Sequence, residues 1–205
     1  AALAHPAEVQ AVDRLYLGGV RKGRGTWGAS GSGASYVDDA HFAGTGVLRV
    51  LGGESTVWDA GGADTAFGTP ENWDFDVVPF LDGSATVTFG AAGTVCALDL
   101  PASLAGLRFS RDADFALAAG GGTLTLGTNG FWAQAPGAVP RAYAVEAPVL
   151  LVAEQAWCVT NNGTGLTTLT VSGGLSDGAA SFGLTHSGNG VLVLAGSNSF
   201  DGAVS

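Results

Sequence analysis

The sequence predicts an all-β protein with a β-solenoid fold, and three observations support that prediction. The 205 residues include 34 glycines, with 46 % hydrophobic and only 13 % charged residues, a composition that suits many short strands joined by tight turns. Apolar residues alternate with polar or small ones, and no helical period of useful length is present. Similar strand-turn units recur along the chain. A β-sandwich is the alternative prediction, although sandwich strands usually follow one another at more regular intervals.

Eight strand-like segments justify the all-β prediction in chain order. Most alternate as a half-buried strand does, and Gly, Asn, Asp or Ser residues bound them. The segments are RLYLGGV (14–20), GVLRVL (46–51), ATVTFG (85–90), GLRFS (106–110), TLTLG (123–127), PVLLV (148–152), TLTVSG (168–173) and GVLVLAG (190–196).

Three units of the chain share one pattern, a glycine-rich start followed by a strand and a glycine-rich turn. They are residues 44–53, 120–130 and 188–199. Recurrence of this kind indicates stacked coils, in which each unit covers the hydrophobic face of the one before it. The spacing is uneven, with a longer excursion at 128–147.

The charge balance argues against two classes of partner. Eighteen acidic and eight basic residues give a net charge of -10, which leaves too few cations to neutralise nucleic acid or to bind an anionic membrane surface. No apolar stretch is long enough for membrane insertion. Five of the eight basic residues fall within residues 1–50, so this relatively basic end and the acidic body are expected to attract one another between molecules.

The N-terminus and the cysteines leave alternatives open. The sequence begins at Ala1 and contains no Met, so either a leader has been removed or the chain is a piece of a longer polypeptide. Cys96 and Cys158 form one disulfide if their backbones come close in an oxidising setting, or else they are buried free thiols. The two cysteines and three scattered histidines do not have a zinc-ligand spacing.

The segment LTHSGNGVLVLAGSNSFDG at 184–202 resembles the autotransporter-associated β-strand repeat, with His186 where that repeat usually has Lys. Upstream, VWDAGGADTAFGTPENWD, ATVTFG, GLRF, QAWCV and LTVSGGLSDG resemble the opening and middle of such a unit, and residues 15–50 resemble the segment that closes an array. The resemblance implies a right-handed parallel β-helix of a long secreted or surface-displayed protein. It also implies a closing-type segment at 1–53 and repeat units at 54–205, within one continuous solenoid.

Paired aspartates are the candidates for catalysis or calcium binding. Glycoside hydrolysis needs two carboxylates about 5 to 9.5 Å apart. Each pair lies in a turn-like context, where Asp commonly bonds the backbone, so turn formation is the expected role. The sequence therefore predicts no catalytic, cofactor-binding or metal site and no enzyme activity. The pairs are Asp38 with Asp39, Asp74 with Asp76, and Asp112 with Asp114.

Five tryptophans are a second kind of candidate. In this fold they are expected to fill the core or to cover the end of a coil, because aromatic side chains bury large areas. The alternative is a platform on which sugar rings stack. The five are Trp27, Trp58, Trp73, Trp132 and Trp157.

Taken together, these patterns favour a structural function. We expect a secreted or cell-surface module that binds copies of itself head-to-tail or adjacent repeats of a longer chain, because an isolated solenoid exposes unpaired strand edges at its ends. The alternative hypothesis is a glycan-binding or adhesive module with surface glycans as partners. A β-helix carbohydrate-active enzyme is less favoured. The residues expected at the assembly interface are Leu15, Tyr16, Leu17, Leu192, Leu194, Asn198 and Phe200.

Overall fold

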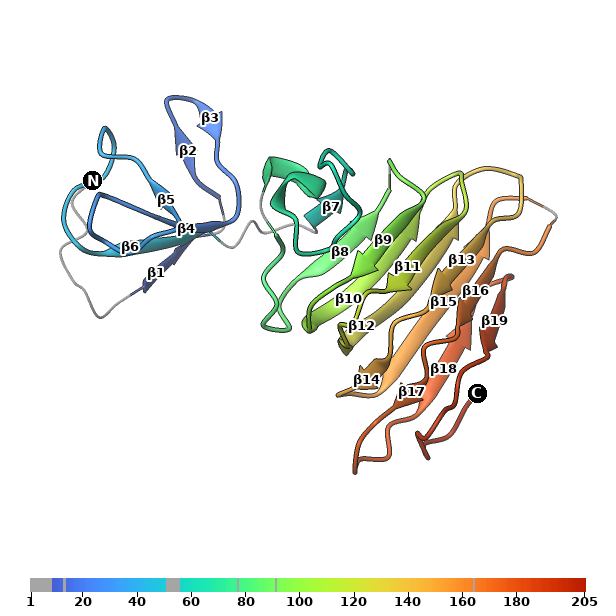
Figure 1. Ribbon diagram of the computed structural model, residues 1–205. Coiled ribbons are helices and arrows are strands. Elements are labelled where there is room, and N and C mark those ends of the chain that lie inside the picture. The colour runs from blue at the N-terminus through green and yellow to red at the C-terminus, as the bar shows by residue number, and fades with distance from the viewer. Residues whose placement is uncertain (1–8, 13, 51–55, 77, 91, 164) are drawn as a thin grey trace.

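Most of the described chain forms a β-solenoid of about four turns, preceded by a smaller sheet (Figure 1). The predicted β-solenoid is therefore confirmed. The alternative, a β-sandwich, is wrong, because sandwich sheets are antiparallel whereas every named strand pair from Thr56 onward is parallel. The structure is a computed structural model, and it describes residues 9–12, 14–50, 56–76, 78–90, 92–163 and 165–205.

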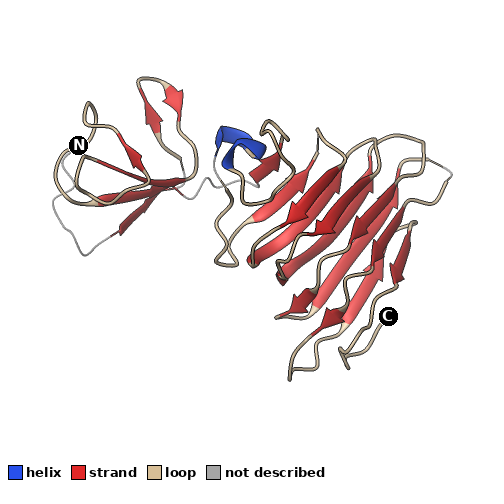
Figure 2. Cartoon of the chain, viewed as in Figure 1, coloured by secondary structure: helices blue, strands red, loops and turns tan. Residues whose placement is uncertain are grey.

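Two parallel sheets build the solenoid (Figure 2). The eight-stranded sheet contains β7 (Thr56–Trp58), β8 (Thr86–Phe89), β10 (Ala102–Ser110), β12 (Leu124–Ala135), β14 (Val149–Leu151), β15 (Gln155–Asn161), β17 (Leu175–Ser176) and β18 (Leu184–Ser187). The five-stranded sheet contains β9 (Val95–Leu98), β11 (Phe115–Ala119), β13 (Ala142–Val145), β16 (Thr168–Val171) and β19 (Val191–Leu194). From β8 onward the chain visits the two sheets in turn, so each coil adds strands to both.

The eight-stranded sheet turns a corner within its long strands. The register between β10 and β12 shifts between Leu104 and Gly106, and β12 pairs with β14 near its start but with β15 near its end. The bent eight-stranded sheet therefore supplies two sides of each coil, and the five-stranded sheet supplies the third. Register partners lie from 20 residues apart, as for Thr86 and Gly106, to 31 residues apart, as for Thr56 and Val87. Variable coil length explains the uneven spacing of the repeats, and the excursion at 128–147 contains the end of β12 and all of β13.

Inward-facing side chains of successive coils stack into one hydrophobic core. The ring of Phe89 stacks on those of Phe109 and Phe115, with centroids 5.5 and 4.5 Å apart, and Phe109 stacks on Tyr143 at 5.3 Å. The Tyr143 hydroxyl donates a 2.6 Å hydrogen bond to the carbonyl of Arg111, and burial raises the pKa of Tyr143 to about 12. The stacked rings thus bury apolar surface along the solenoid axis, while the one polar atom among them, the Tyr143 hydroxyl oxygen, remains hydrogen-bonded.

Two glycines show why the corners of the coils are rich in this residue. A Cβ at Gly122 would lie 2.1 Å from the carbonyl oxygen of Leu100, and one at Gly173 would lie 2.1 Å from that of Ala147. Because the backbone of the preceding coil occupies this space, any side chain would push the coils apart. The glycine content of the sequence is in part a consequence of close stacking.

An aromatic cap covers the N-terminal end of the solenoid. It consists of Trp58, Phe67 and Trp73, each 0 % exposed, and it lies beside η1 (Pro70–Asn72) and η2 (Asp74–Asp76). The rings of Trp58 and Trp73 meet edge to face at 5.1 Å, and Trp73 Nε1 donates to the carbonyl of Phe67 at 2.7 Å. The first coil is therefore sealed by side chains of its own chain.

Residues 9–50 form their own sheets. The four-stranded sheet runs in the order β1 (Val9–Val12), β6 (Val47–Val50), β4 (Gly25–Gly28) and β5 (Tyr36–Val37), and β4 and β6 are antiparallel. A hairpin joins β2 (Tyr16–Leu17) to β3 (Val20–Arg21). The described strands of this N-terminal unit pair with one another and not with those of the solenoid. The boundary expected between 53 and 54 lies outside the described residues.

The single strand expected at 14–20 is wrong, because the chain reverses there. Gly18 and Gly19 have φ values of +59° and +80°, which glycine adopts without strain, and they form the tip of the β2–β3 hairpin. The paired glycines within the apolar run were the sequence feature that indicated this turn.

The N-terminal unit contacts the capped end of the solenoid. Arg24 Nη1 donates to Thr56 Oγ1 at 2.6 Å, and Arg49 Nη2 pairs with an Asp82 carboxylate oxygen at 2.5 Å. Both guanidinium groups lie over the ring of Phe80, 5.0 and 4.2 Å from its centroid. These contacts place the unit outside the first coil, near the aromatic cap.

Candidate functional site

The C-terminal end of the solenoid presents the edge of its last complete coil. Val191 and Ala195 each donate a 2.8 Å backbone hydrogen bond toward β16. Because N–H groups alternate in direction along a parallel strand, those of Leu192 and Leu194 point away from β16. Within the described residues, no strand pairs with that edge of β19. We call this edge, with Leu192, Leu194 and Phe200, the open end.

The side chains of the open end are only partly covered. Leu192, Leu194 and Phe200 pack against the core from one side and are half-buried, whereas Val193 faces outward and is 37 % exposed. Asn198 has an internal role, because its side-chain oxygen accepts the N–H of Leu175 at 3.0 Å and so holds the last corner in place. Three of the four C-terminal residues predicted for assembly therefore form an apolar end surface.

A further strand begins beside β18. Leu184 donates its N–H to the carbonyl of Ala203 at 2.8 Å, and Ser205 donates to the carbonyl of Leu184 at 3.0 Å. His186 donates to the carbonyl of Ser205 at 2.8 Å. Residues 203–205 thus follow the parallel register of the coils before them.

The other three residues predicted for assembly lie in the N-terminal unit, at the opposite end of the molecule from β19 (Figure 1). Leu15 and Leu17 are half-buried and pack against a small core that contains Trp27. Tyr16 is 55 % exposed, and the neighbouring Val20 is 60 % exposed. The structure brings the two halves of the predicted interface to opposite ends, where they can meet only between molecules.

Five of the six paired aspartates bond a nearby turn, strand or side chain through their carboxylates. Asp112 accepts two hydrogen bonds from Arg141, at 3.0 and 2.8 Å, and Asp114 accepts the N–H of Ala142 at 2.9 Å. Asp74 accepts the N–H of Val57 at 2.8 Å.

The N-terminal pair is bonded in the same way. A hydrogen bond from His41 lowers the pKa of Asp38, and one from Ser30 lowers that of Asp39. Among the described residues, no group of three or more His, Cys, Asp or Glu side chains is arranged to hold a metal ion.

Trp132 differs from the other four tryptophans. Trp58, Trp73 and Trp157 are fully buried and Trp27 is 9 % exposed, whereas Trp132 is 45 % exposed on the outer face of β12. Arg108 of β10 is its register neighbour, with the guanidinium carbon 5.7 Å from the ring centroid. Sequence analysis did not select Arg108, although the alternation of 106–110 predicts that its side chain faces outward.

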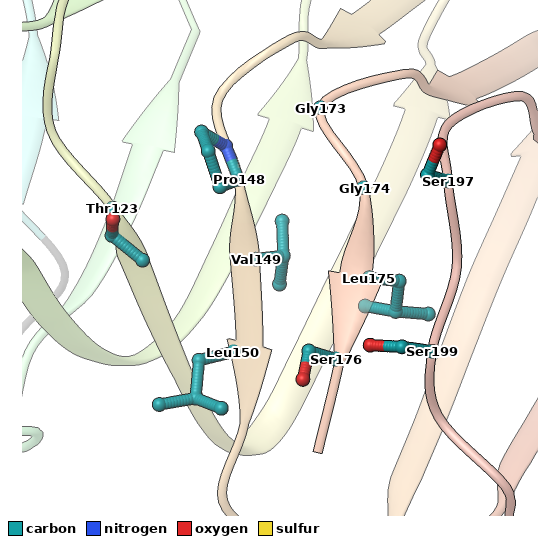
Figure 3. Close-up of a pocket in the computed structure, with 10 residues that line it drawn as sticks. All are labelled: Thr123, Pro148, Val149, Leu150, Gly173, Gly174, Leu175, Ser176, Ser197 and Ser199. Carbon is teal, nitrogen blue, oxygen red and sulfur yellow. The ribbon is translucent and has the colours of Figure 1, made fainter. Parts of the chain in front are cut away.

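A groove of about 370 Å³ crosses the outer surface of β14 and β17 (Figure 3). No charged side chain lines it. Hydroxyl groups of serine and threonine are its polar side-chain groups. The full lining consists of Thr123, Pro148, Val149, Leu150, Gly173, Gly174, Leu175, Ser176, Ser197 and Ser199.

Both cysteines are free thiols, so the disulfide alternative is wrong. Cys96 is buried in β9, and this burial raises the pKa of its thiol. Cys158 is half-buried in β15, where it is the register neighbour of Trp132.

Comparisons of the chain with protein-family models, with curated proteins and with solved structures returned no match. The resemblance to the autotransporter-associated repeat stays a prediction. Neither helix in the described part of the chain has the length or apolar character to cross a membrane. Fold and geometry define the chain as a β-solenoid with one capped end and one open end.

Proposed function

We propose that this chain is a structural module of an extracellular or cell-surface assembly, in which further β-coils stack on its open end. The observation that supports this function best is the edge of β19, where the N–H groups of Leu192 and Leu194 point away from β16 and the side chains of both residues are only half-buried. Such an edge is a template for another strand. The added coil comes from a second copy or from adjacent repeats of a longer chain.

Charge favours a head-to-tail arrangement of copies. Residues 1–55 carry five basic and five acidic side chains, so the N-terminal end is neutral, whereas residues 56–205 carry three basic and thirteen acidic ones. Two acidic solenoid ends would repel each other, but a neutral N-terminal unit meets the open end without that penalty. The exposed Tyr16 and Val20 add apolar area to the neutral partner surface. A contact of this kind does not close on itself and builds fibres.

Negative-stain electron microscopy and sedimentation velocity at neutral pH test the proposal. The wild-type chain is expected to form fibres or linear oligomers that grow with concentration. Leu192→Glu places a charge on the open end and is expected to abolish growth. Val193→Glu is the matched control, since it adds the same charge to the same strand on its outward face. Wild-type particles that stay monomeric at every concentration, or equal growth of both variants, would contradict self-association through the open end.

Adhesion through surface glycans is the alternative function, and one observation favours it. Trp132 exposes an aromatic ring on the outer side of the solenoid, where fibre growth along the axis would leave it accessible. No arrangement of the paired aspartates favours the enzyme hypothesis, because five of their six carboxylates bond turns, strands or neighbouring side chains.

A further inference from the structure

The outer face of the eight-stranded sheet carries an exposed aromatic ring in a defined setting. Trp132 lies between its register neighbours Arg108 on β10 and Cys158 on β15. Its Nε1 donates a 3.3 Å hydrogen bond to the side-chain oxygen of Gln134, two residues along the same strand face. These neighbours limit the rotamers of the ring, so an exposed apolar surface is held in place before any ligand arrives.

Planar polar groups lie on the same outer face as the ring, on both sides of it along the strands. Gln134 lies on one side, and on the other the Asn129 amide donates to Thr86 Oγ1 at 3.0 Å, one side-chain position along the strands from Arg108. Amide and guanidinium groups offer several donors and acceptors in fixed directions. An aromatic ring beside such groups suits a ligand that has both apolar ring faces and many hydroxyl groups.

Arg108 adds a positive charge that no acidic side chain in the described part of the chain neutralises. The solenoid segment 56–205 contains three arginines. Arg111 donates to the carbonyl of Ala92 at 2.7 Å, and Arg141 pairs with Asp112. Arg108 is exposed and makes no ion pair with any described residue. On a strongly acidic solenoid, an exposed guanidinium of this kind complements a ligand that carries carboxylate groups.

We infer that this face binds an acidic polysaccharide. A sugar ring stacks on Trp132, and the Arg108 guanidinium binds the carboxylate of a uronic-acid residue. Gln134 and Asn129 bond the hydroxyl groups of that residue or its neighbour. We call Trp132, Arg108, Gln134 and Asn129 the sugar platform. It lies on the side of the solenoid and is separate from the open end, so binding and axial growth are independent properties.

Polygalacturonate and its fully methyl-esterified form test this inference, because they share a backbone and differ in charge. Titration calorimetry and tryptophan fluorescence are expected to show binding of polygalacturonate and at least about tenfold weaker binding of the ester. Trp132→Ala is expected to weaken polygalacturonate binding at least about tenfold. Arg108→Gln is expected to remove the preference for the acid over the ester.

Arg141→Gln is the matched control, since it removes one positive charge at a distance from the platform and is expected to bind polygalacturonate as the wild-type chain does. Thermal unfolding followed by circular dichroism checks that each variant is folded. Equal binding of the acid and the ester, no binding of either, or wild-type affinity in folded Trp132→Ala would overturn the inference. Sedimentation of Trp132→Ala is expected to match that of the wild type. Loss of polysaccharide binding can therefore be distinguished from loss of self-association through the open end.

The thiol of Cys158 supplies an independent measurement. It neighbours Trp132 and is half-buried, whereas Cys96 is fully buried with a raised pKa. N-ethylmaleimide is therefore expected to alkylate Cys158 in the folded protein, and saturating polygalacturonate is expected to slow that reaction several-fold. An unchanged alkylation rate at saturating polymer would show that the polymer binds elsewhere and would overturn the assignment.

Discussion

At the N-terminal end of the solenoid, the aromatic cap seals the first coil and the N-terminal unit packs outside it through Arg24 and Arg49. At the C-terminal end, Leu192 and Leu194 are half-buried and the described residues leave one edge of β19 unpaired. Both ends belong to the same stack of parallel coils. The difference teaches that stacking of parallel coils leaves a strand edge at either end, whereas covering an end requires particular large side chains.

The largest expected effect comes from opening the capped end. Trp73→Ala removes a fully buried ring and its hydrogen bond to Phe67, and it should lower the free energy of unfolding by about 3 to 5 kcal/mol. Phe200→Ala at the open end should cost only about 1 kcal/mol, because that ring is half-buried. Urea unfolding of both variants measures the contrast. Similar losses at the two positions would refute the distinction between the ends.

A smaller change in the free energy of unfolding is expected at His186. This residue is the last in a row of inward-facing side chains that runs through successive coils toward the open end. The inward-facing register positions before His186 hold Leu107, Phe131 and Trp157. Among the described residues, the buried Nε2 of His186 has no hydrogen-bond partner. His186→Phe should therefore raise the free energy of unfolding by about 1 kcal/mol.

His186→Asn is the control for this position, since it keeps a polar side chain there and should not raise the free energy of unfolding. Chemical denaturation measures the free energy of unfolding of the two variants and of the wild-type chain. A loss of stability in His186→Phe would mean that the imidazole has a role that the surrounding contacts do not reveal.

The smallest effect concerns the contact between the N-terminal unit and the capped end. Hydrogen bonds from Ser84 and Arg49 lower the pKa of the Asp82 carboxyl from 3.8 to about 2. A depressed folded-state pKa contributes stability that is fully present above pH 3.8 and is lost as the pH falls toward about 2. The contribution is small because Asp82 is largely exposed.

Comparison of the wild-type chain with Asp82→Asn measures that contribution. The wild type should be the more stable of the two above pH 4, and the difference should shrink as the pH approaches about 2. A difference that does not change across this range would show that Asp82 titrates normally.

Much of the solenoid was predictable from local patterns. Six segments between 85 and 196 were predicted as strands, and each contains or overlaps an observed one, from β8 to β19. Three strands that went unpredicted, β9, β11 and β13, are short and contain Ala, which has little β preference. The candidate sites show the same limit. Apolar residues of the last coil were predicted for assembly, but the sugar platform joins residues of two strands, β10 and β12.

By itself the sequence determined the all-β class, the alternation of buried and exposed positions, and the glycine-rich corners, because these depend on neighbouring residues and on backbone geometry. Only the tertiary structure decided which strands pair, since coils of 20 to 31 residues leave several registers open. It also decided that one end is capped and the other open, and that Arg108 lies beside Trp132. Those outcomes depend on contacts between residues far apart in the chain, which a local pattern does not encode.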